Sequence, residues 1–204
     1  MNTSNHPPTL YLSACALNGD ISGVREHISQ SSQHERDSAL ASAAHSGHLD
    51  IVRCLLEHGA NPHHSNSMAL THAAAMGHSD IVETLLPVSD LKANNTDALS
   101  SAAFRGRVDC LRLLLLFMDA KTNNHHTLTE ALRGARIFST PDHQACVDIL
   151  LPLSDLAVFL KTFENTPLVW RMYHNMWGPL IAQQQANKLS AVVKEGQRTA
   201  HKKI

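Results

Sequence analysis

The sequence predicts an all-α solenoid of about five to six stacked helical hairpins with a helical C-terminal cap. Three observations lead to this fold class. Glycines recur at positions 19, 47, 77 and 106, at intervals of 28, 30 and 29 residues. Of the 204 residues, 43% are hydrophobic but only 4% are aromatic, so Ala and Leu supply the core, as is typical of packed helices. The segments on either side of each glycine repeat one another and have helical periodicity.

The segment before each glycine predicts a first helix with one small-residue face. Residues 39–46, 69–76 and 98–105 read "ALASAAHS", "ALTHAAAM" and "ALSSAAFR". In each, a leucine stands three and four residues before two alanines, which is the spacing of one helical face. Small side chains allow this helix to lie close to the same helix of the next unit.

The glycine itself predicts the end of the first helix, because it adopts a left-handed backbone at little cost. A histidine or arginine follows it and opens the turn to the second helix. An acid then precedes the second helix, where the helix dipole favours negative charge. The second helices, within 51–57, 81–87 and 110–116, have apolar residues at i, i+1, i+4 and i+5 and so a broad buried stripe.

A fifth unit lacks the glycine but keeps the register. Residues 146–156, "CVDILLPLSDL", match residues 81–91, "IVETLLPVSDL". Its two helices are separated by "RIFSTPD", which we interpret as an insertion near 137–142. One interpretation is a tolerated surface loop, since longer loops cost little stability. The alternative is a projection that contacts a partner.

A hairpin of this size cannot bury its own apolar face, so the units must stack. The pattern "AL..AA..GH.DIV..LL..GAN" resembles the ankyrin repeat, and the stretch "GHLDIVRCLLEHGANP" carries that resemblance most strongly. The resemblance covers residues 10–156. These units are shorter than the 33 residues of the family and lack its "TPLH" opening. The "LPVSD" linkers are similar to ankyrin proteins of host-associated bacteria and some large viruses.

The two ends differ from the repeats. We expect residues 1–9 and the basic tail, 196–204, to be disordered or flexible. Residues 157–195 contain five of the nine aromatic side chains, and "NTPLVWRMYHNMWGP" has helix start and stop signals. We interpret this segment as a degenerate repeat that caps the stack, because a solenoid must cover its last apolar face. A ligand cage built from Trp170, Tyr173 and Trp177 is the alternative.

The sequence contains no recognisable catalytic or metal-binding motif. Of the 15 histidines, His63, His64, His125 and His126 fall in the expected inter-repeat loops, and the ankyrin resemblance implies that His48 and His78 close a local hydrogen bond in the turn after the glycine. Cys-x-x-Cys, His-Glu-x-x-His, phosphate-binding glycine loops and nucleophile elbows are absent. We therefore expect no enzyme activity, no cofactor, no metal site and no small-molecule substrate.

Charge, hydropathy and cysteine content indicate which partners and which compartment to expect. Residues 1–156 carry 10 basic and 16 acidic side chains, against 7 and 2 in residues 157–204, so an acidic body argues against nucleic acid. Residues 1–10 have no basic n-region and no apolar h-region, so we expect no cleaved secretory signal. No apolar run approaches 18 residues, so we expect no membrane-spanning helix. Its four cysteines fall at apolar positions, which indicates reduced core thiols. We predict a cytoplasmic monomer.

The family resemblance implies that a protein partner binds the concave face, which is formed by the outward side of the first helices and the inter-repeat loops. Placing this sequence on the family pattern gives the helix positions Ser42, His45, His72, Met76, Ser101, Phe104, Arg105, Glu130 and Arg133. At the loop rim it gives His63, His64, Asn66, Lys92, Asn94, Asn95, Lys121, Asn123 and Asn124. Phe104 is the preferred anchor, because aromatic residues beside Met and Arg are typical of interface centres. Packing of Phe104 between adjacent helices is the alternative.

Three hypotheses follow from the sequence. The first is a non-catalytic protein-interaction module, an exported effector or adaptor that is delivered into a host cell. The second is a metal-binding or enzymatic protein that uses the histidines or the C-terminal segment. The third is a regulatory or inhibitory subunit that acts through the basic tail.

Overall fold

The structure is a computed structural model that describes residues 8–91, 97–119, 126–153, 182–183 and 186. The chain divides into two compact units, Met1–Leu153 and Ser154–Ile204. Within the described ranges every regular element is a helix. The expectations for the cap, the basic tail and most of the disordered N-terminus fall on residues outside these ranges. In the first unit, α1 begins at Pro8, two residues before the predicted start of the repeats.

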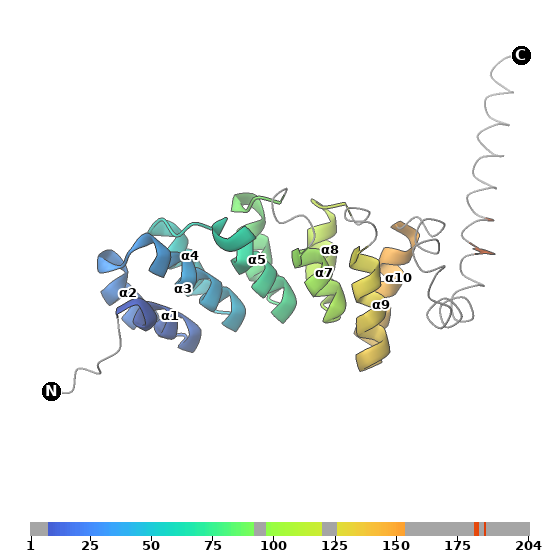
Figure 1. Cartoon of the computed structure of the whole chain (residues 1–204), viewed down its shortest axis with the longest axis horizontal. Coiled ribbons are helices and arrows are strands. Elements are labelled where there is room, and N and C mark those ends of the chain that lie inside the picture. Colours follow the sequence, from blue (N-terminus) through green and yellow to red (C-terminus); the bar gives the residue numbers. More distant parts are fainter. Residues whose placement is uncertain (1–7, 92–96, 120–125, 154–181, 184–185, 187–204) are drawn as a thin grey trace, which may run out of the picture. The chain divides into compact units, whose positions relative to one another are not determined.

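The first unit is a row of helical hairpins (Figure 1). Its first helices are α1 (Pro8–Asn18), α3 (Gln33–Ser46), α5 (His64–Met76), α7 (Asp97–Phe104) and α9 (His126–Phe138). Its second helices are α2 (Ile21–His27), α4 (Leu49–Glu57), α6 (Ser79–Leu85), α8 (Val108–Leu115) and α10 (Pro141–Leu150). Short 3-10 turns follow α2, α6 and α10 at Ile28–Gln30, Leu86–Val88 and Leu151–Leu153.

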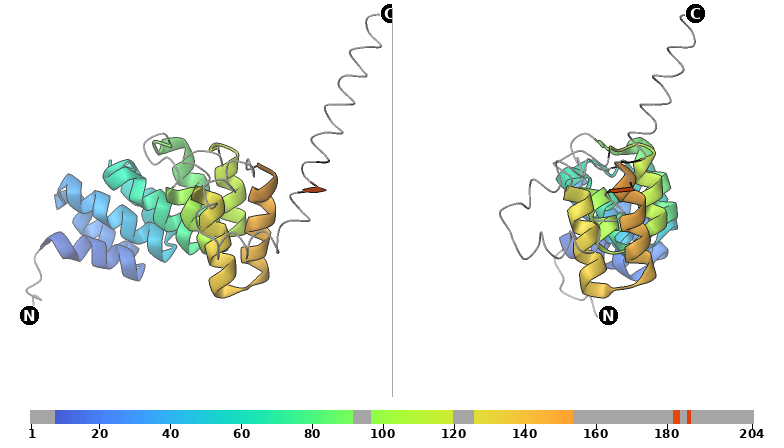
Figure 2. Two further views of the ribbon diagram at one scale, coloured as in Figure 1. Left: turned by 45° about the vertical axis from the view of Figure 1, so that its right-hand side comes forward. Right: turned by 90° about the vertical axis from the view of Figure 1, so that its right-hand side faces the viewer.

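The hairpins stack in two layers, as the sequence predicts for a solenoid. Each first helix packs against the first helix of the next hairpin, and the second helices do the same in a parallel layer. Figure 2 shows α9 and α10 side by side at the end of the row. The alanine pairs of the first helices, such as Ala43 with Ala44 and Ala73 with Ala74, have no exposed surface. Small side chains are therefore what allows neighbouring first helices to approach closely.

The second helices supply the larger apolar side chains of the core. Ile51, Val52 and Leu55 of α4 are fully buried, and so are the matching residues of α6. Burial of each such side chain contributes about 1.5–3 kcal/mol to the free energy of unfolding. Because both layers are buried along the row, the core is continuous from hairpin to hairpin.

The recurring glycines end the first helices in the left-handed conformation that the sequence predicts. Gly47 has φ of 84° and Gly77 has φ of 89°. A Cβ atom at Gly47 would lie 2.6 Å from Cε1 of His78 in the next hairpin. The ring Nε2 of His78 lies 3.1 Å from the carbonyl oxygen of His45, which can only accept a hydrogen bond. The expectation of a local bond is therefore wrong, because the histidine bonds to the preceding hairpin.

The same cross-hairpin contact recurs along the row. Nε2 of His48 lies 3.2 Å from the carbonyl oxygen of Leu17, and Nε of Arg107 donates to the carbonyl oxygen of Ala75 over 3.2 Å. Each glycine thus combines a left-handed φ with a surface on which the basic side chain of the next hairpin rests. This pairing sets the distance between successive hairpins.

The fifth hairpin differs from the prediction. The residues interpreted as an insertion do not form a loop between helices: Arg136, Ile137 and Phe138 extend α9, and Pro141 begins α10. Only Ser139 and Thr140 lie between the two helices. Ser139 takes φ of 51° at the position where the other hairpins have glycine. The physical reason is that "RIF" has no helix breaker, whereas Thr140 followed by Pro141 favours a new helix start.

Candidate functional site

A groove of about 430 Å³ lies along the exposed side of α5, α7 and α9. Six side chains expected from the sequence line this groove: His72, Ser101, Phe104, Arg105, Glu130 and Arg133. They come from three different first helices and meet because those helices stack directly on one another. The structure thus brings together the central part of the predicted helix set.

Phe104 and Arg133 form the best-defined contact in the groove. The guanidinium carbon of Arg133 lies 4.5 Å from the centre of the Phe104 ring, a cation–π geometry. Nη2 of Arg133 is 3.2 Å from Oε2 of Glu130, one helical turn earlier on α9. Phe104 also meets the ring of Phe138 edge to face at 5.8 Å. The predicted anchor is therefore held by α9 on one side while it remains partly exposed to the groove.

Histidines continue the surface from the groove toward the N-terminal hairpins. The rings of His45 on α3 and His72 on α5 meet edge to face at 5.3 Å. The Nδ1 atom of His72 lies 3.4 Å from the carbonyl oxygen of Ala41. Ser42 donates its hydroxyl hydrogen to the carbonyl oxygen of Ser38 over 3.0 Å, so its oxygen faces its own helix. Ser42, His45 and Met76 do not line the groove.

Sequence reasoning missed five residues that line the groove: Thr71, Ala75, Asp97, Ser100 and His126. A signal for two of them was present, because Asp97 and Ser100 share with Phe104 the i, i+3, i+7 spacing of one helical face. The hydroxyl oxygens of Ser100 and Thr127 are 3.3 Å apart and join α7 to α9 beneath the groove. This buried contact helps to hold the two helices that carry Phe104 and Arg133.

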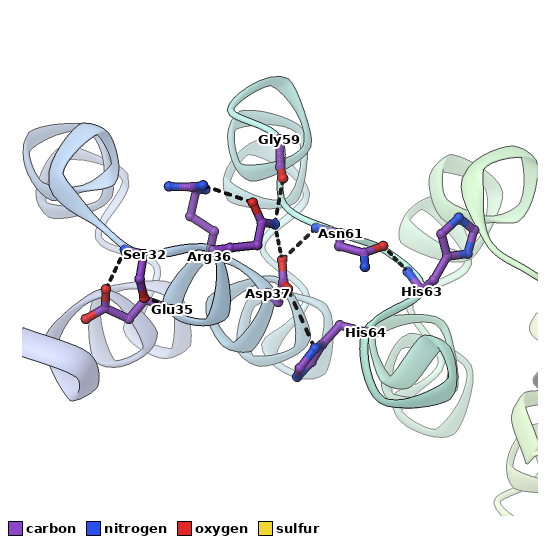
Figure 3. Close-up of polar contacts among 9 residues, drawn as sticks. Ser32, Glu35, Arg36, Asp37, Gly59, Asn61, His63 and His64 are labelled. Atoms are coloured by element: carbon purple, nitrogen blue, oxygen red, sulfur yellow. Dashed lines mark hydrogen bonds and ion pairs between the residues drawn. The ribbon is translucent and has the colours of Figure 1, made fainter.

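The predicted loop residues His63 and His64 belong to a separate polar network (Figure 3). Its centre is Asp37 on α3, which is 5% exposed. One carboxylate oxygen of Asp37 accepts hydrogen bonds from the Asn61 backbone N–H and from Nε2 of Gln33, both over 2.7 Å. Nδ1 of His64 lies 3.6 Å from the other oxygen. The network fastens the loop after α4 onto α3.

His63 extends this network to the following hairpin. Its backbone N–H donates to Oδ1 of Asn61 over 3.0 Å, and its ring Nδ1 accepts a hydrogen bond from the backbone N–H of Asp90 over 2.9 Å. The exposed ring of His63 therefore links two inter-repeat loops. A role for His63 and His64 in partner binding stays a prediction, and both side chains also have this structural role.

No group of three or more His, Cys, Asp or Glu side chains that could hold a metal ion occurs among the described residues. The four cysteines are buried and unpaired. Burial, aided by the nearby carboxylate of Asp109, raises the pKa of the Cys110 thiol to about 11. Burial, together with Asp142, raises that of Cys146 to about 12. Both thiols stay protonated near neutral pH and are therefore poor nucleophiles.

Several predicted features lie outside the described residues. These are the loop positions Lys92, Asn94, Asn95, Lys121, Asn123 and Asn124, the aromatic segment with Trp170, Tyr173 and Trp177, and the basic tail. The described helices include none that is both long enough and apolar enough to span a bilayer.

A family model described as "Ankyrin repeats (3 copies)" matches residues 12–97. No curated protein matches the chain. The matched range runs from α1 to the first residue of α7, and the same helix-pair architecture continues to residue 153.

Proposed function

Because residues 12–97 of this chain are ankyrin repeats, we propose that the chain is a protein-interaction module that binds its partner in the groove along α5, α7 and α9. Ankyrin repeats are generally protein–protein interaction modules. The groove lies on the first helices. Part of it belongs to the last two hairpins, which come after residues 12–97 in the chain and have the same helix-pair architecture.

One observation carries this proposal. Six of the residues that the ankyrin resemblance assigns to the binding face line a single hollow in which an aromatic ring is held by a stacked arginine. Aromatic and arginine side chains are enriched at the energetic centre of protein interfaces. A ring that is already held by its neighbours loses little conformational entropy when a partner binds, which favours affinity.

A binding role also agrees with the layout of the hairpins. The core is formed by alanines on one face of the first helices and by the second-helix layer, so the outward side of the first helices can vary without disturbing it. The groove residues differ from hairpin to hairpin, with His72 on α5, Phe104 on α7 and Arg133 on α9. Such variation on a constant scaffold is how a repeat protein acquires specificity.

Affinity capture with matched variants tests the proposal. Arg105 is exposed at the groove, whereas Arg53 is exposed on α4, in the other layer. We expect a binding protein captured by the wild-type chain to be captured equally by Arg53→Glu and lost with Arg105→Glu. Equal capture by both variants, together with unchanged capture by the groove variant Ser101→Arg, would place the binding surface elsewhere.

A second pair of variants controls for stability. Phe104→Ala removes the anchor but also its contacts with Arg133 and Phe138, so we expect a lower melting temperature as well as weaker capture. Ser101→Arg fills the groove from the same helix without removing a core contact. Loss of capture with Ser101→Arg at an unchanged melting temperature would support the groove as the binding surface.

The finer predictions from the sequence remain part of this proposal. They are a non-catalytic module, a cytoplasmic monomer, and an effector or adaptor that acts after export.

A further inference from the structure

We propose that the partner segment carries an acidic residue beside an apolar one, and that Arg105 binds the carboxylate while Ile137 and Phe138 contact the apolar side chain. This inference rests on the proposed function, namely that the groove binds a protein. It adds a charge preference to the groove and extends the binding surface onto the end of α9.

The end of α9 provides the apolar part of this surface. The additional residues of the fifth hairpin continue α9 beyond the end of α7 (Figures 1 and 2). They leave two large apolar side chains exposed, Ile137 at 54% and Phe138 at 50%. Adjacent exposed apolar residues beside a hollow are a common mark of a binding surface.

Phe138 is held in place although half of its surface is exposed. Its ring stacks on the imidazole of His143 with centroids 5.0 Å apart and planes inclined by 27°. It also contacts Phe104 edge to face. The His143 ring is 7% exposed and lies 2.5 Å, through Nδ1, from the hydroxyl oxygen of Thr140. These contacts hold the aromatic ring before any partner arrives.

Arg105 joins the two parts of the surface. A second hollow, of about 340 Å³, adjoins Phe138 and is lined by Arg105, Arg107, Thr140, Asp142 and His143. Arg105 also lines the groove that contains Phe104. A partner segment that lies across the Phe104–Phe138 contact therefore meets Arg105 whether it occupies the groove or the second hollow.

The arginines of this region are not equally available to a partner. Arg133 is paired with Glu130 and stacked on Phe104, and Nε of Arg107 donates to the Ala75 carbonyl. Within the part of the chain that the structure describes, the guanidinium of Arg105 makes no hydrogen bond or ion pair. An exposed guanidinium of this kind is suited to bidentate binding of a carboxylate.

Among the described residues, the acidic side chains near Arg105 do not pair with its guanidinium, so the guanidinium can bind a carboxylate of a partner. Glu130 is already paired with Arg133. Asp97 is the first residue of α7, eight residues before Arg105, which is about 12 Å at 1.5 Å per residue. Asp142 lines the second hollow but not the groove, and in the second hollow Arg105 and Arg107 outnumber it. The positive end of the surface is therefore at Arg105, next to the exposed aromatic ring.

The charge of the remaining hairpins favours a short acidic segment over a polyanion. Residues 8–91 carry three arginines or lysines and nine acids. A nucleic acid that extended from Arg105 along this row would meet repulsion at each hairpin. A single carboxylate flanked by apolar residues avoids that repulsion, since it needs only the local positive charge.

Peptide selection on the full chain tests the inference. The immobilised chain is used to select from a random 12-residue library displayed on phage. The strongest peptide is then synthesised with a fluorescent label and titrated by anisotropy. We expect selected peptides to place Asp or Glu within a few residues of Leu, Ile, Phe or Trp. We expect Arg105→Glu to weaken binding by about tenfold or more, as for a charge-assisted contact.

A reciprocal charge swap separates recognition from structural effects. If Arg105 contacts the peptide acid, a peptide with that acid changed to lysine binds the wild-type chain weakly and recovers binding to Arg105→Glu. A purely structural role of Arg105 would not produce this recovery. Phe138→Ala should weaken binding several-fold, whereas Phe117→Ala should not, since Phe117 is a comparable ring, 61% exposed, that lines neither hollow.

The outcomes distinguish this inference from the proposed function. Suppose that the selected peptides lose affinity for Ser101→Arg. If they also contain no acid, or bind Arg105→Glu as well as the wild-type chain, the acidic partner is overturned and the groove stays the binding surface. Peptides indifferent to both groove variants, or no selection above an unrelated protein, overturn the proposed function as well. A labelled single-stranded oligonucleotide is titrated in the same anisotropy assay. If it binds the wild-type chain more tightly than the selected peptide does, and Arg105→Glu weakens that binding, the partner is a nucleic acid and the acidic protein segment is overturned.

Discussion

Replacing Gly47 with alanine tests the contact that spaces the hairpins. Gly47 has φ of 84°, and a Cβ atom there would lie 2.6 Å from Cε1 and 2.8 Å from Nδ1 of His78. Gly59 provides a matched control, because its φ is 79° but a Cβ atom would meet nothing within 4 Å. The two substitutions therefore share the backbone cost and differ in the steric cost.

The expected magnitudes follow from these distances. A left-handed backbone costs a non-glycine residue about 1–2 kcal/mol, so Gly59→Ala should lower the free energy of unfolding by about 1 kcal/mol. Gly47→Ala adds the displacement of the His78 ring, with loss of its 3.1 Å bond to the His45 carbonyl. That bond contributes about 0.5–1.5 kcal/mol and repacking costs a similar amount, so the total should reach about 3 kcal/mol.

Urea unfolding followed by far-ultraviolet circular dichroism measures both variants. The comparison uses midpoints at a constant slope, because a repeat stack can unfold in parts. The double variant Gly47→Ala/His78→Ala completes a cycle: removing the ring should relieve the clash, giving a coupling free energy of about 1–2 kcal/mol. Equal destabilisation by Gly47→Ala and Gly59→Ala, or no coupling with His78, would refute the role of the cross-hairpin contact.

Three further predictions concern packing, ionisation and thiol reactivity. Ala74→Leu should destabilise the chain by about 1–3 kcal/mol in urea unfolding, because Ala74 has no exposed surface; Ala75→Leu, in the partly exposed groove wall, should cost less. Hydrogen bonds from the backbone N–H and side chain of Ser32 lower the pKa of Glu35 below its ordinary 4.5. The ionised Glu35 carboxylate therefore adds to the free energy of unfolding at a pH above its ordinary pKa, and this contribution is lost as the pH falls through the lower folded-state pKa. Glu35→Gln should reduce the dependence of the free energy of unfolding on acid pH, as measured by urea unfolding. Cys110 and Cys146, with pKa values raised by burial to about 11 and 12, should resist alkylation at pH 8 in the folded chain and react in urea, as measured by mass spectrometry; rapid labelling of the folded chain would contradict their burial.

The positions of the groove were predictable in part, but its geometry was not. The ankyrin resemblance assigns to the binding face Ser101 and Phe104 of α7, Arg105 directly after it, and Glu130 and Arg133 of α9. The stacking of Arg133 on Phe104 depends on how far apart α7 and α9 lie and how each is rotated. Spacing within one helix contains no information on either quantity.

The length of α9 could not be predicted from the sequence. Because the fifth unit lacks the glycine, "RIFSTPD" was interpreted as an insertion between helices. In the structure Ser139 takes the left-handed φ, so the additional residues lengthen the helix and expose Phe138. A non-glycine residue seldom adopts this conformation. Phe138, which precedes Ser139, contacts Phe104 on α7 and His143 on α10, and neither contact is visible in the sequence of α9.

By itself the sequence determined the all-α class, the row of hairpins, the alanine face and the left-handed glycines. These features depend on periodicities of one helix or one repeat, which are local and therefore visible in the chain. Only the tertiary structure decided that His48 and His78 bond to the preceding hairpin, and that Phe104, Arg133 and Phe138 meet. Contacts between hairpins depend on the length, rotation and separation of helices in space, which no single repeat specifies.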